Sequence, residues 1–315
     1  MSRVRIPDEI LSAAHARSQA RARSDWAEAD RLRRVIEDAG WRVVDRGVDF
    51  SLEPARPQDI ETDGSRVHGS SESVPSRLAE PADRAVTIIV LPEAGEPADF
   101  IAAGPDDATV TDRHVVVVTG HASDAQPTEG VEIVRMLETA PLGDRLNAAL
   151  RRSRGGVIAI LDPRCADRSD ILDALRRGLD DAAVAVAGGS GSRTDDLRSF
   201  TPVDGEADVV GLECVAFRRA DVIALGPIDP RFHDVRLLGA WLSLSLRYGS
   251  KAPDLDDPPT PRAAYVVAPA DPACGPRLAE TAAMDPVARR AVRRDFYRVR
   301  DAFGPLLARK STTRA

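Results

Sequence analysis

The chain has 315 residues, of which 43% are hydrophobic and 30% are charged, so it can bury the core of one large domain together with a smaller one. Its net charge of −7 excludes a uniformly basic protein, and contact with nucleic acid would need a local basic patch. The sequence has no apolar run long enough to span a membrane, no secretory signal pattern and no cysteine spacing typical of zinc sites. We therefore expect a cytoplasmic protein without a transmembrane segment.

Residues 7–53 are predicted to form two helices followed by a β-hairpin. Asp25 is the expected N-cap of the second helix. Gly40 ends this helix, and beyond it apolar and polar residues alternate on both sides of a turn at Arg46. The stripe of the second helix that we expect to be buried consists of Trp26, Ala29, Leu32, Ile36 and Ala39.

This N-terminal module, residues 1–53, resembles the C-terminal end of cysteinyl-tRNA synthetases. The matching stretches are ARARSDWAEADRLRR (20–34) and GWRVVD (40–45). The resemblance implies RNA or tRNA as a partner, whereas the acidic residues between the arginines fit a salt-bridged helix pair that binds no RNA. The chain has no HIGH-type or KMSKS-type signature and no zinc-ligand set, so aminoacyl-tRNA ligase activity is not expected.

Residues 54–84 are rich in Pro, Ser, Gly and charged residues and lack apolar periodicity, and we predict a flexible linker there. From residue 85 onward, unbroken apolar runs alternate with helical stretches, which indicates an α/β fold with a mostly parallel sheet. The expected strands lie at 86–91, 115–118, 131–134, 157–161, 183–187, 209–217 and 264–268, and the expected helices at 142–154, 169–180, 235–247 and 286–309.

The stretch from Gly143 to Arg164 combines a helix, a buried strand and a carboxylate where that strand ends. Gly155 and Gly156 stop the helix, and the apolar run that follows ends at Asp162. Because ligands of open α/β sheets bind at the carboxyl ends of the strands, Asp162 is a candidate ligand of a metal ion or a sugar nucleotide. The alternative is that its carboxylate caps the next turn.

In the order and spacing of its elements, the region 85–270 resembles family 2 glycosyltransferases, which have the GT-A fold of nucleotide-diphospho-sugar transferases. The stretches that carry the resemblance are TIIVL (87–91), VVVTGHASD (116–124), NAALRRSRGGVIAILD (147–162), GLECVAFRR (211–219), LGPIDPRF (225–232) and WLSLSLRYG (241–249). The resemblance implies a GT-A-like domain that transfers a sugar from a nucleotide-sugar donor. A basic amphipathic helix and tail follow at 271–315.

By this resemblance, the donor-binding residues are Thr119, Asp124, Asn147, Asp162 and Arg164. Thr119 stands where the family has an aspartate that contacts the nucleotide base. The sequence Asp162-Pro163-Arg164 stands where the family has the D-x-D pair that holds a divalent ion.

The acidic positions of the family are largely replaced, and Asp234 is the remaining candidate base for activating the acceptor hydroxyl. Arg164 cannot ligate a cation, because a guanidinium is always charged and only donates hydrogen bonds. It would either bind the diphosphate in place of a metal or pair with an aspartate at a retired site, and the loss of several acidic positions together favours the second. We expect no metal or cofactor, with Mg²⁺ or Mn²⁺ used only where the family mechanism is retained.

The last helix has a basic side and an apolar stripe made of Val292, Phe296, Val299 and Phe303. We predict a helix packed on the domain with a solvated basic face, and docking on RNA or an anionic membrane is the alternative. The sequence therefore predicts two alternative functions. The first is a family 2-type glycosyltransferase relative, active or decayed, and the second is a non-catalytic scaffold that binds a nucleotide, tRNA/RNA or a protein partner.

Overall fold

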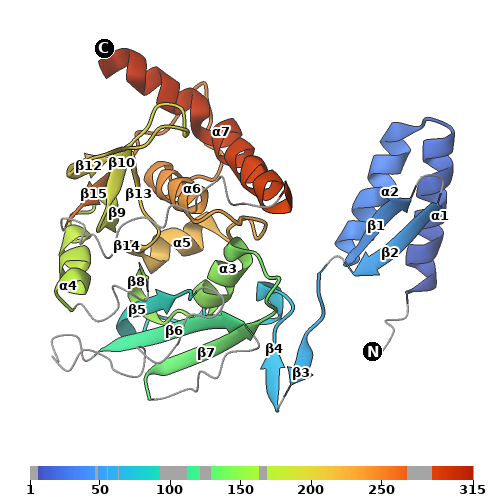
Figure 1. Cartoon of the computed structure of the whole chain (residues 1–315), viewed down its shortest axis with the longest axis horizontal. Coiled ribbons are helices and arrows are strands. Elements are labelled where there is room, and N and C mark those ends of the chain that lie inside the picture. The colour runs from blue at the N-terminus through green and yellow to red at the C-terminus, as the bar shows by residue number, and fades with distance from the viewer. Residues whose placement is uncertain are drawn as a thin grey trace. The chain divides into compact units, whose positions relative to one another are not determined.

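The structure is a computed structural model that describes residues 6–46, 49–54, 56–62, 64–92, 112–120, 129–162, 169–267 and 286–314 (Figure 1). The chain divides into two compact units, Met1–Ile60 and Glu61–Ala315. Each unit has its own apolar core. Among the described helices, none combines the length and the hydropathy needed to cross a bilayer.

Unit 1 is a helical hairpin followed by a β-hairpin, as the sequence predicts. Its elements are α1 (Asp8–Ala22), α2 (Trp26–Asp38), β1 (Trp41–Arg46) and β2 (Asp49–Pro54), and the two strands are antiparallel. Ala14 and Ile36 are fully buried between the helices and the hairpin. The backbone N–H of Glu28 donates to the Asp25 side chain over 3.2 Å, which confirms Asp25 as the N-cap of α2.

Two side chains of unit 1 depart from the simple helical pattern. Arg17 is 5% exposed and donates to the Asp45 carboxylate over 2.8 Å, which ties α1 to β1. Trp26 is 59% exposed, so its predicted burial is wrong. It is the first residue of α2, and a helical side chain leans toward the N-terminus of its helix, so the indole extends past the end of the hairpin.

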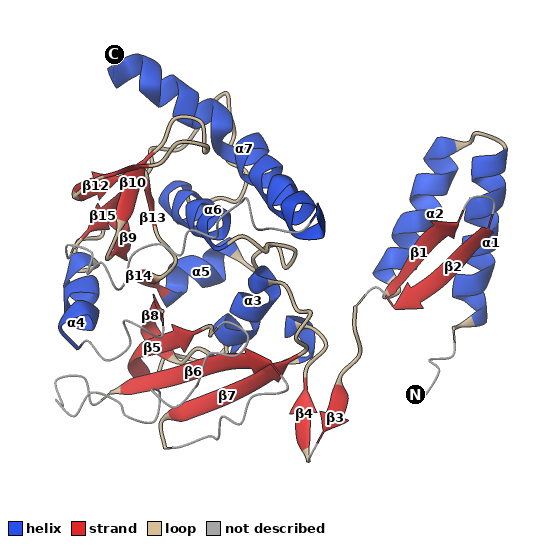
Figure 2. Cartoon of the chain, in the orientation of Figure 1, coloured by secondary structure: helices blue, strands red, loops and turns tan. Residues whose placement is uncertain are grey.

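Unit 2 is built on a single eight-stranded sheet with the order β12-β15-β9-β14-β8-β5-β6-β7 (Figure 2). Strands β7, β6, β5 and β8 are parallel to one another, and β15 is parallel to β9, whereas β14 runs antiparallel to β8 and β9 and β12 antiparallel to β15. The α/β fold with a mostly parallel sheet is therefore confirmed. The strands are β5 (Arg84–Val90), β6 (Arg113–Gly120), β7 (Val131–Met136), β8 (Gly155–Leu161), β9 (Val184–Gly188), β12 (Gly205–Ala207), β14 (Cys214–Arg218) and β15 (Ala263–Val266).

Helices cover both faces of this sheet, which explains why its strands are apolar without alternation. On one face, Ile158 and Ile160 of β8 pack with Leu146 of α3 and with side chains of α5, α6 and α7. On the other face, Leu161 packs with Leu175 of α4. The helices are α3 (Leu142–Arg152), α4 (Ser169–Gly178), α5 (Arg219–Leu225), α6 (Val235–Tyr248) and α7 (Pro286–Arg314).

The smaller elements of unit 2 include several that the sequence does not predict. The expected strand at 209–217 consists of two strands separated by a turn, because its buried apolar residues do not all lie in extended backbone. The seven-residue helix α5 was not expected. The remaining elements are β3 (Ile60–Thr62), β4 (Ser65–Val67), the 3₁₀ helix η1 (Ser71–Ser73), β10 (Gly191–Arg193), β11 (Thr201–Pro202) and β13 (Val209–Val210).

The prediction of a flexible linker is wrong for residues 61–84, which contain β3, β4 and η1 and belong to unit 2. The N–H of Ser71 donates to the Asp144 carboxylate over 3.1 Å, and Arg151 donates to the Val74 carbonyl over 2.7 Å. Val67 and Val74 are each 1% exposed. This segment is ordered by hydrogen bonds to α3 and by two isolated apolar anchors, and neither produces the periodicity on which the prediction was based.

Candidate functional site

The topology of unit 2 places a switch point between β5 and β8. From β5 the chain passes to β6 and β7 on one side, and α3 then carries it back to β8 on the other side. In open α/β sheets, ligands bind outside the carboxyl ends of the strands at such a point. The residues that follow β5, β6 and β8, at 93–111, 121–128 and 163–168, lie outside the described residues.

Arg145 of α3 joins the carboxyl ends of β5 and β6. Its Nη2 donates to the carbonyl oxygens of Pro92, over 2.7 Å, and Val118, over 2.8 Å. A charged donor shared by two carbonyls fixes the separation of the two strand ends. The sequence analysis did not identify Arg145, because its partners lie 53 and 27 positions before it in the chain.

Two buried acidic residues occupy neighbouring backbone positions at the end of β8. The register pairs Leu161 with Cys214, so Glu213 stands opposite Asp162, and the N–H of Asp162 donates to the Glu213 carbonyl over 2.6 Å. Glu213 itself lies in the turn that precedes β14. Asp162 is 7% exposed and Glu213 is 6% exposed. Asp162 is thus found at the strand end, as predicted, and Glu213 is a residue that the sequence analysis missed.

Thr119 lies near the end of β6 on the other face of the sheet. It is 3% exposed, and its hydroxyl has no hydrogen-bond partner among the described residues. Alternation along the strands sets Thr119 with Val117, on the face covered by α4, whereas Asp162 follows Ile160 on the face covered by α3. A buried hydroxyl without a partner is uncommon in proteins, and the role of Thr119 in donor binding stays a prediction.

Asn147, a predicted donor-binding residue, forms two buried hydrogen bonds to the backbone of Ile228. Its Nδ2 donates to the carbonyl of Ile228 over 2.8 Å, and the N–H of Ile228 donates to its Oδ1 over 2.9 Å. The side chain therefore holds the connection between α5 and α6 against α3. Its role in donor binding remains a prediction.

Asp234, the predicted base, is the N-cap of α6. Its Oδ1 accepts a hydrogen bond from the N–H of Leu237 over 2.8 Å, and its own N–H donates to Asp295 over 3.0 Å. Asp295 of α7 is fully buried and also accepts from the N–H of His233, so α7 holds the segment that precedes α6. The geometry gives Asp234 a structural contact, and the base role stays a prediction.

Asp124 and Arg164, the other two predicted donor-binding residues, lie outside the described residues. Within the described ranges, no group of three or more His, Cys, Asp or Glu side chains is arranged to hold a metal ion. Cys214 does not supply a thiolate either, because burial, together with the nearby charge of Glu213, raises the pKa of its thiol to about 11.

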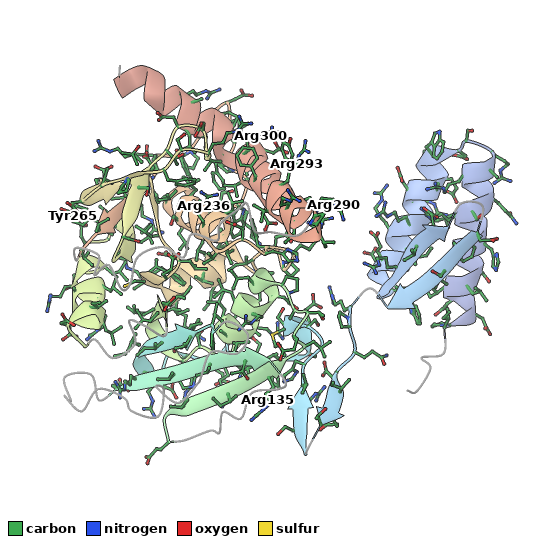
Figure 3. All side chains as sticks on the ribbon, viewed as in Figure 1. Arg135, Arg236, Tyr265, Arg290, Arg293 and Arg300 are labelled. Atoms are coloured by element: carbon green, nitrogen blue, oxygen red, sulfur yellow. The ribbon has the colours of Figure 1, made fainter. Side chains whose placement is uncertain are left out.

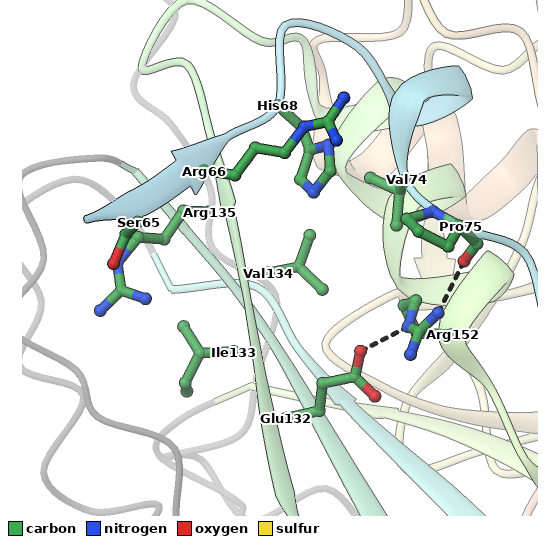
Figure 4. A pocket seen from close by; sticks show the side chains of 10 residues that line it. All are labelled: Ser65, Arg66, His68, Val74, Pro75, Glu132, Ile133, Val134, Arg135 and Arg152. Atoms are coloured by element: carbon green, nitrogen blue, oxygen red, sulfur yellow. Dashed lines mark hydrogen bonds and ion pairs between the residues drawn. The ribbon is translucent and has the colours of Figure 1, made fainter. Parts of the chain in front are cut away.

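A separate cavity of about 330 Å³ lies at the outer edge of β7, beside β4 (Figure 4). Arg66, Arg135 and Arg152 line it, together with the Glu132 carboxylate. Arg152 forms an ion pair with Glu132 and donates to the Pro75 carbonyl over 2.8 Å, so this arginine anchors the 61–84 segment to β7.

Comparison with known proteins finds no protein-family model that matches the chain. The chain is 43% identical over 51 residues to the cysteine–tRNA ligase of Opitutus terrae. This match covers 16% of the chain and 11% of that ligase, so most of the ligase has no counterpart here.

Among solved structures, the chain is similar to a mannosyltransferase from Pyrobaculum calidifontis in complex with GDP-Man and Mn²⁺, with 18% identity and a TM-score of 0.39 over 64% of this chain and 59% of that one. It is similar to residues 1–349 of TarS from S. aureus, with 13% identity and a TM-score of 0.34 over 50% and 56% of the two chains. It is also similar to glucosyl-3-phosphoglycerate synthase from Mycobacterium tuberculosis in complex with UDP, with 12% identity and a TM-score of 0.42 over 69% and 81%. The similarity concerns the general arrangement of helices and strands.

Proposed function

We propose that unit 2 binds a nucleotide-sugar at the carboxyl edge of β5, β6 and β8, and that the chain is a relative of family 2 glycosyltransferases. The observation that carries this proposal is the presence of two buried acidic residues, Asp162 and Glu213, whose backbones are hydrogen-bonded to each other at the end of β8, beside the switch point. Carboxylates at this edge accept hydrogen bonds from ribose and sugar hydroxyls. Two of the stretches that resemble the transferase family, 87–91 and 147–162, end at this edge, after β5 and β8.

The residues at this edge and Asp234 have different proposed roles. Asp162 and Glu213 face the sugar, Thr119 offers its hydroxyl to the base, and Arg164 donates to the diphosphate. Arg145 touches no ligand in this proposal and acts as a positioning residue, because it fixes the ends of β5 and β6. Asp234 is the proposed base if an acceptor hydroxyl is activated.

The proposal does not require a resident metal ion. The similar mannosyltransferase carries Mn²⁺ together with GDP-Man. In this chain, a cation would have two carboxylates, Asp162 and Glu213, and would need oxygens of the diphosphate to complete its shell. Donor binding in the absence of Mn²⁺ therefore tests whether Arg164 takes the place of the ion.

The test is a thermal-shift and calorimetric titration of the full chain with UDP-, GDP- and dTDP-sugars, with and without Mn²⁺. A ligand at about 100 times its dissociation constant stabilises the folded state by about 2.7 kcal/mol. Asp162→Asn and Glu213→Gln should each weaken binding, and Glu206→Gln, at an exposed position of β12, serves as the matched control. If no donor raises the melting temperature, the proposal fails and the scaffold alternative takes precedence.

A second candidate function concerns unit 1, which we propose contacts RNA. Trp26 is 59% exposed, and the Arg21 guanidinium lies 5.9 Å from the centre of its ring. An exposed aromatic ring beside an arginine is a surface on which a nucleic-acid base can stack. Trp26→Ala in the full chain should weaken RNA binding without changing the response to nucleotide-sugars. Equal RNA binding by the variant and the parent would remove this candidate.

A further inference from the structure

The exposed side of α7 forms a stripe of arginines on an otherwise acidic protein. The stripe, which we call the α7 stripe, contains Arg289, Arg290, Arg293, Arg294 and Arg300, and Figure 3 labels three of them along the helix. With 3.6 residues per turn, these five side chains fall within an arc of about 140°. Arg289, Arg290 and Arg294 have no ion pair or hydrogen bond with a carboxylate of the described residues.

Aromatic rings of α7 contact two of these guanidinium groups and one arginine next to the stripe. Arg293 and Arg300 lie 5.6 and 4.4 Å from the centre of the Tyr297 ring. Arg198, from the segment before β11, lies 5.3 Å from the Phe296 ring, also on α7. A guanidinium that rests on a ring keeps its N–H edge available for phosphate oxygens and loses less freedom on binding.

The two carboxylates of α7, Asp295 and Asp301, neutralise little of the positive charge of the stripe. Asp295 is fully buried and bonded to Arg298 over 2.5 Å, so it does not face the surface. Asp301 pairs with Arg300 over 2.7 Å and offsets a single charge. The hydrogen bond from Arg293, together with the nearby positive charges, lowers the pKa of Tyr297, as expected where the local potential is positive.

The form of the stripe favours a linear polyanion over a membrane. From Arg289 to Arg300, at a rise of 1.5 Å per residue, the arginines extend over about 16 Å along the helix axis, with Arg289 and Arg293 about one turn apart and Arg293 and Arg300 about two turns apart. Val299 and Phe303 of α7 are fully buried against the rest of unit 2, and Val292 and Phe296 are partly buried there. Val287, in the first turn, is a single exposed apolar residue at 63%, so the apolar stripe of the helix is used in packing and is not free to insert into a bilayer.

We infer that the α7 stripe binds the phosphate backbone of a single-stranded nucleic acid. The site is distinct from the nucleotide-sugar edge proposed above, because the arginines lie on the exposed side of α7 and its other side packs on the rest of unit 2. Binding through phosphates is sequence-tolerant and depends steeply on salt. For about four phosphate contacts, the affinity falls about 50-fold between about 50 and 200 mM salt, since each contact to a single strand contributes about −0.7 to the slope.

The test measures fluorescence anisotropy of labelled oligouridylate and of a DNA single strand titrated with the full chain at several salt concentrations. The variant carries Arg289→Gln, Arg290→Gln, Arg293→Gln and Arg294→Gln. It should lose most of its affinity and most of its salt slope. Replacement of the same four residues by Lys, which retains the charge, should restore much of both.

Two controls separate the α7 stripe from other basic surfaces. Arg84→Gln combined with Arg177→Gln removes two exposed arginines elsewhere in unit 2 and should leave binding within about twofold of the parent, because surface charges far from the site are screened. Trp26→Ala reports on unit 1 and should leave the slope due to α7 unchanged.

Three outcomes would overturn the inference. The first is a parent protein that binds neither strand at the lowest salt. The second is a four-Gln variant that melts like the parent and still binds with the parent slope. The third is binding to vesicles of anionic lipid that exceeds binding to nucleic acid and depends on the same four arginines.

Discussion

Asn147→Ala is the substitution that best distinguishes a structural role from a donor-binding role in α3. The amide makes two hydrogen bonds to the backbone of Ile228, at 2.8 and 2.9 Å, and Ile228 is 1% exposed. Alanine would leave the N–H and the C=O of Ile228 without partners inside the protein. Each buried polar group left unsatisfied costs about 1–3 kcal/mol, so the expected loss of unfolding free energy is about 2–6 kcal/mol.

The expected loss is large enough to measure in the full chain. In a domain of 150–250 residues, 1 kcal/mol shifts the melting temperature by about 2–4 °C, so a loss of about 4 kcal/mol lowers it by about 8–16 °C. Thermal unfolding followed by fluorescence suits this measurement, because Trp241 is 5% exposed and its ring lies 5.6 Å from that of Phe232, in the connection that Asn147 holds.

Ser153→Ala, at the C-cap of the same helix, is the matched control. The Ser153 hydroxyl is buried and donates to the Leu150 carbonyl over 2.7 Å, so its removal deletes one local hydrogen bond and should cost about 1 kcal/mol. The reasoning is refuted if Asn147→Ala melts like the parent and binds nucleotide-sugar more weakly. That result would assign the amide to the ligand.

Three further predictions concern other parts of the chain. Arg145→Met keeps the aliphatic stem but deletes both bonds to the strand ends, and we expect a loss of about 2–4 kcal/mol in urea unfolding together with weaker donor binding. The hydrogen bond from Arg17, together with nearby positive charges, lowers the pKa of Asp45 in the folded state. The stability of unit 1 should therefore be constant above about pH 5 and fall as the pH drops through the lowered pKa. Urea titrations at a series of pH values should show a smaller loss of stability at low pH for Asp45→Asn than for the parent. The Cys214 thiol, with a pKa of about 11 and 1% exposure, should react with a disulfide reagent at pH 8 only after unfolding in urea, and rapid reaction of the native protein at this position would contradict its burial.

Apolar periodicity predicted most of the fold, because a buried face of a strand or helix requires apolar residues at regular intervals in the sequence. The run Val157–Leu161 is the core of β8, and the helix expected at 235–247 is α6. Apolar periodicity did not predict that segment 61–84 is ordered. Its order depends on hydrogen bonds between residues more than seventy positions apart, such as that from Arg151 to Val74.

The candidate site was predictable only where it coincides with a strand end. Asp162 follows from the apolar run that precedes it, whereas Arg145 and Glu213 have no local signal. Arg145 lies in the middle of an amphipathic helix, and its function depends on carbonyls from two other strands. Glu213 precedes an ordinary apolar run, and only the backbone pairing with Asp162 shows that it lies at the end of β8.

Arg164 stands where the transferase family has the second aspartate of its D-x-D pair. This one replacement does not show how many carboxylates lie at the edge of the sheet. A motif is read along one segment, but the site is assembled from neighbouring strands, and the antiparallel β14 brings Glu213 to Asp162 from 51 positions away. If both carboxylates serve the donor, Asp162→Asn and Glu213→Gln should weaken binding to a similar extent, and the double variant should lose less than the sum of the two. Additive losses would mean that Glu213 acts independently of Asp162, and the edge would then retain a single carboxylate for the donor.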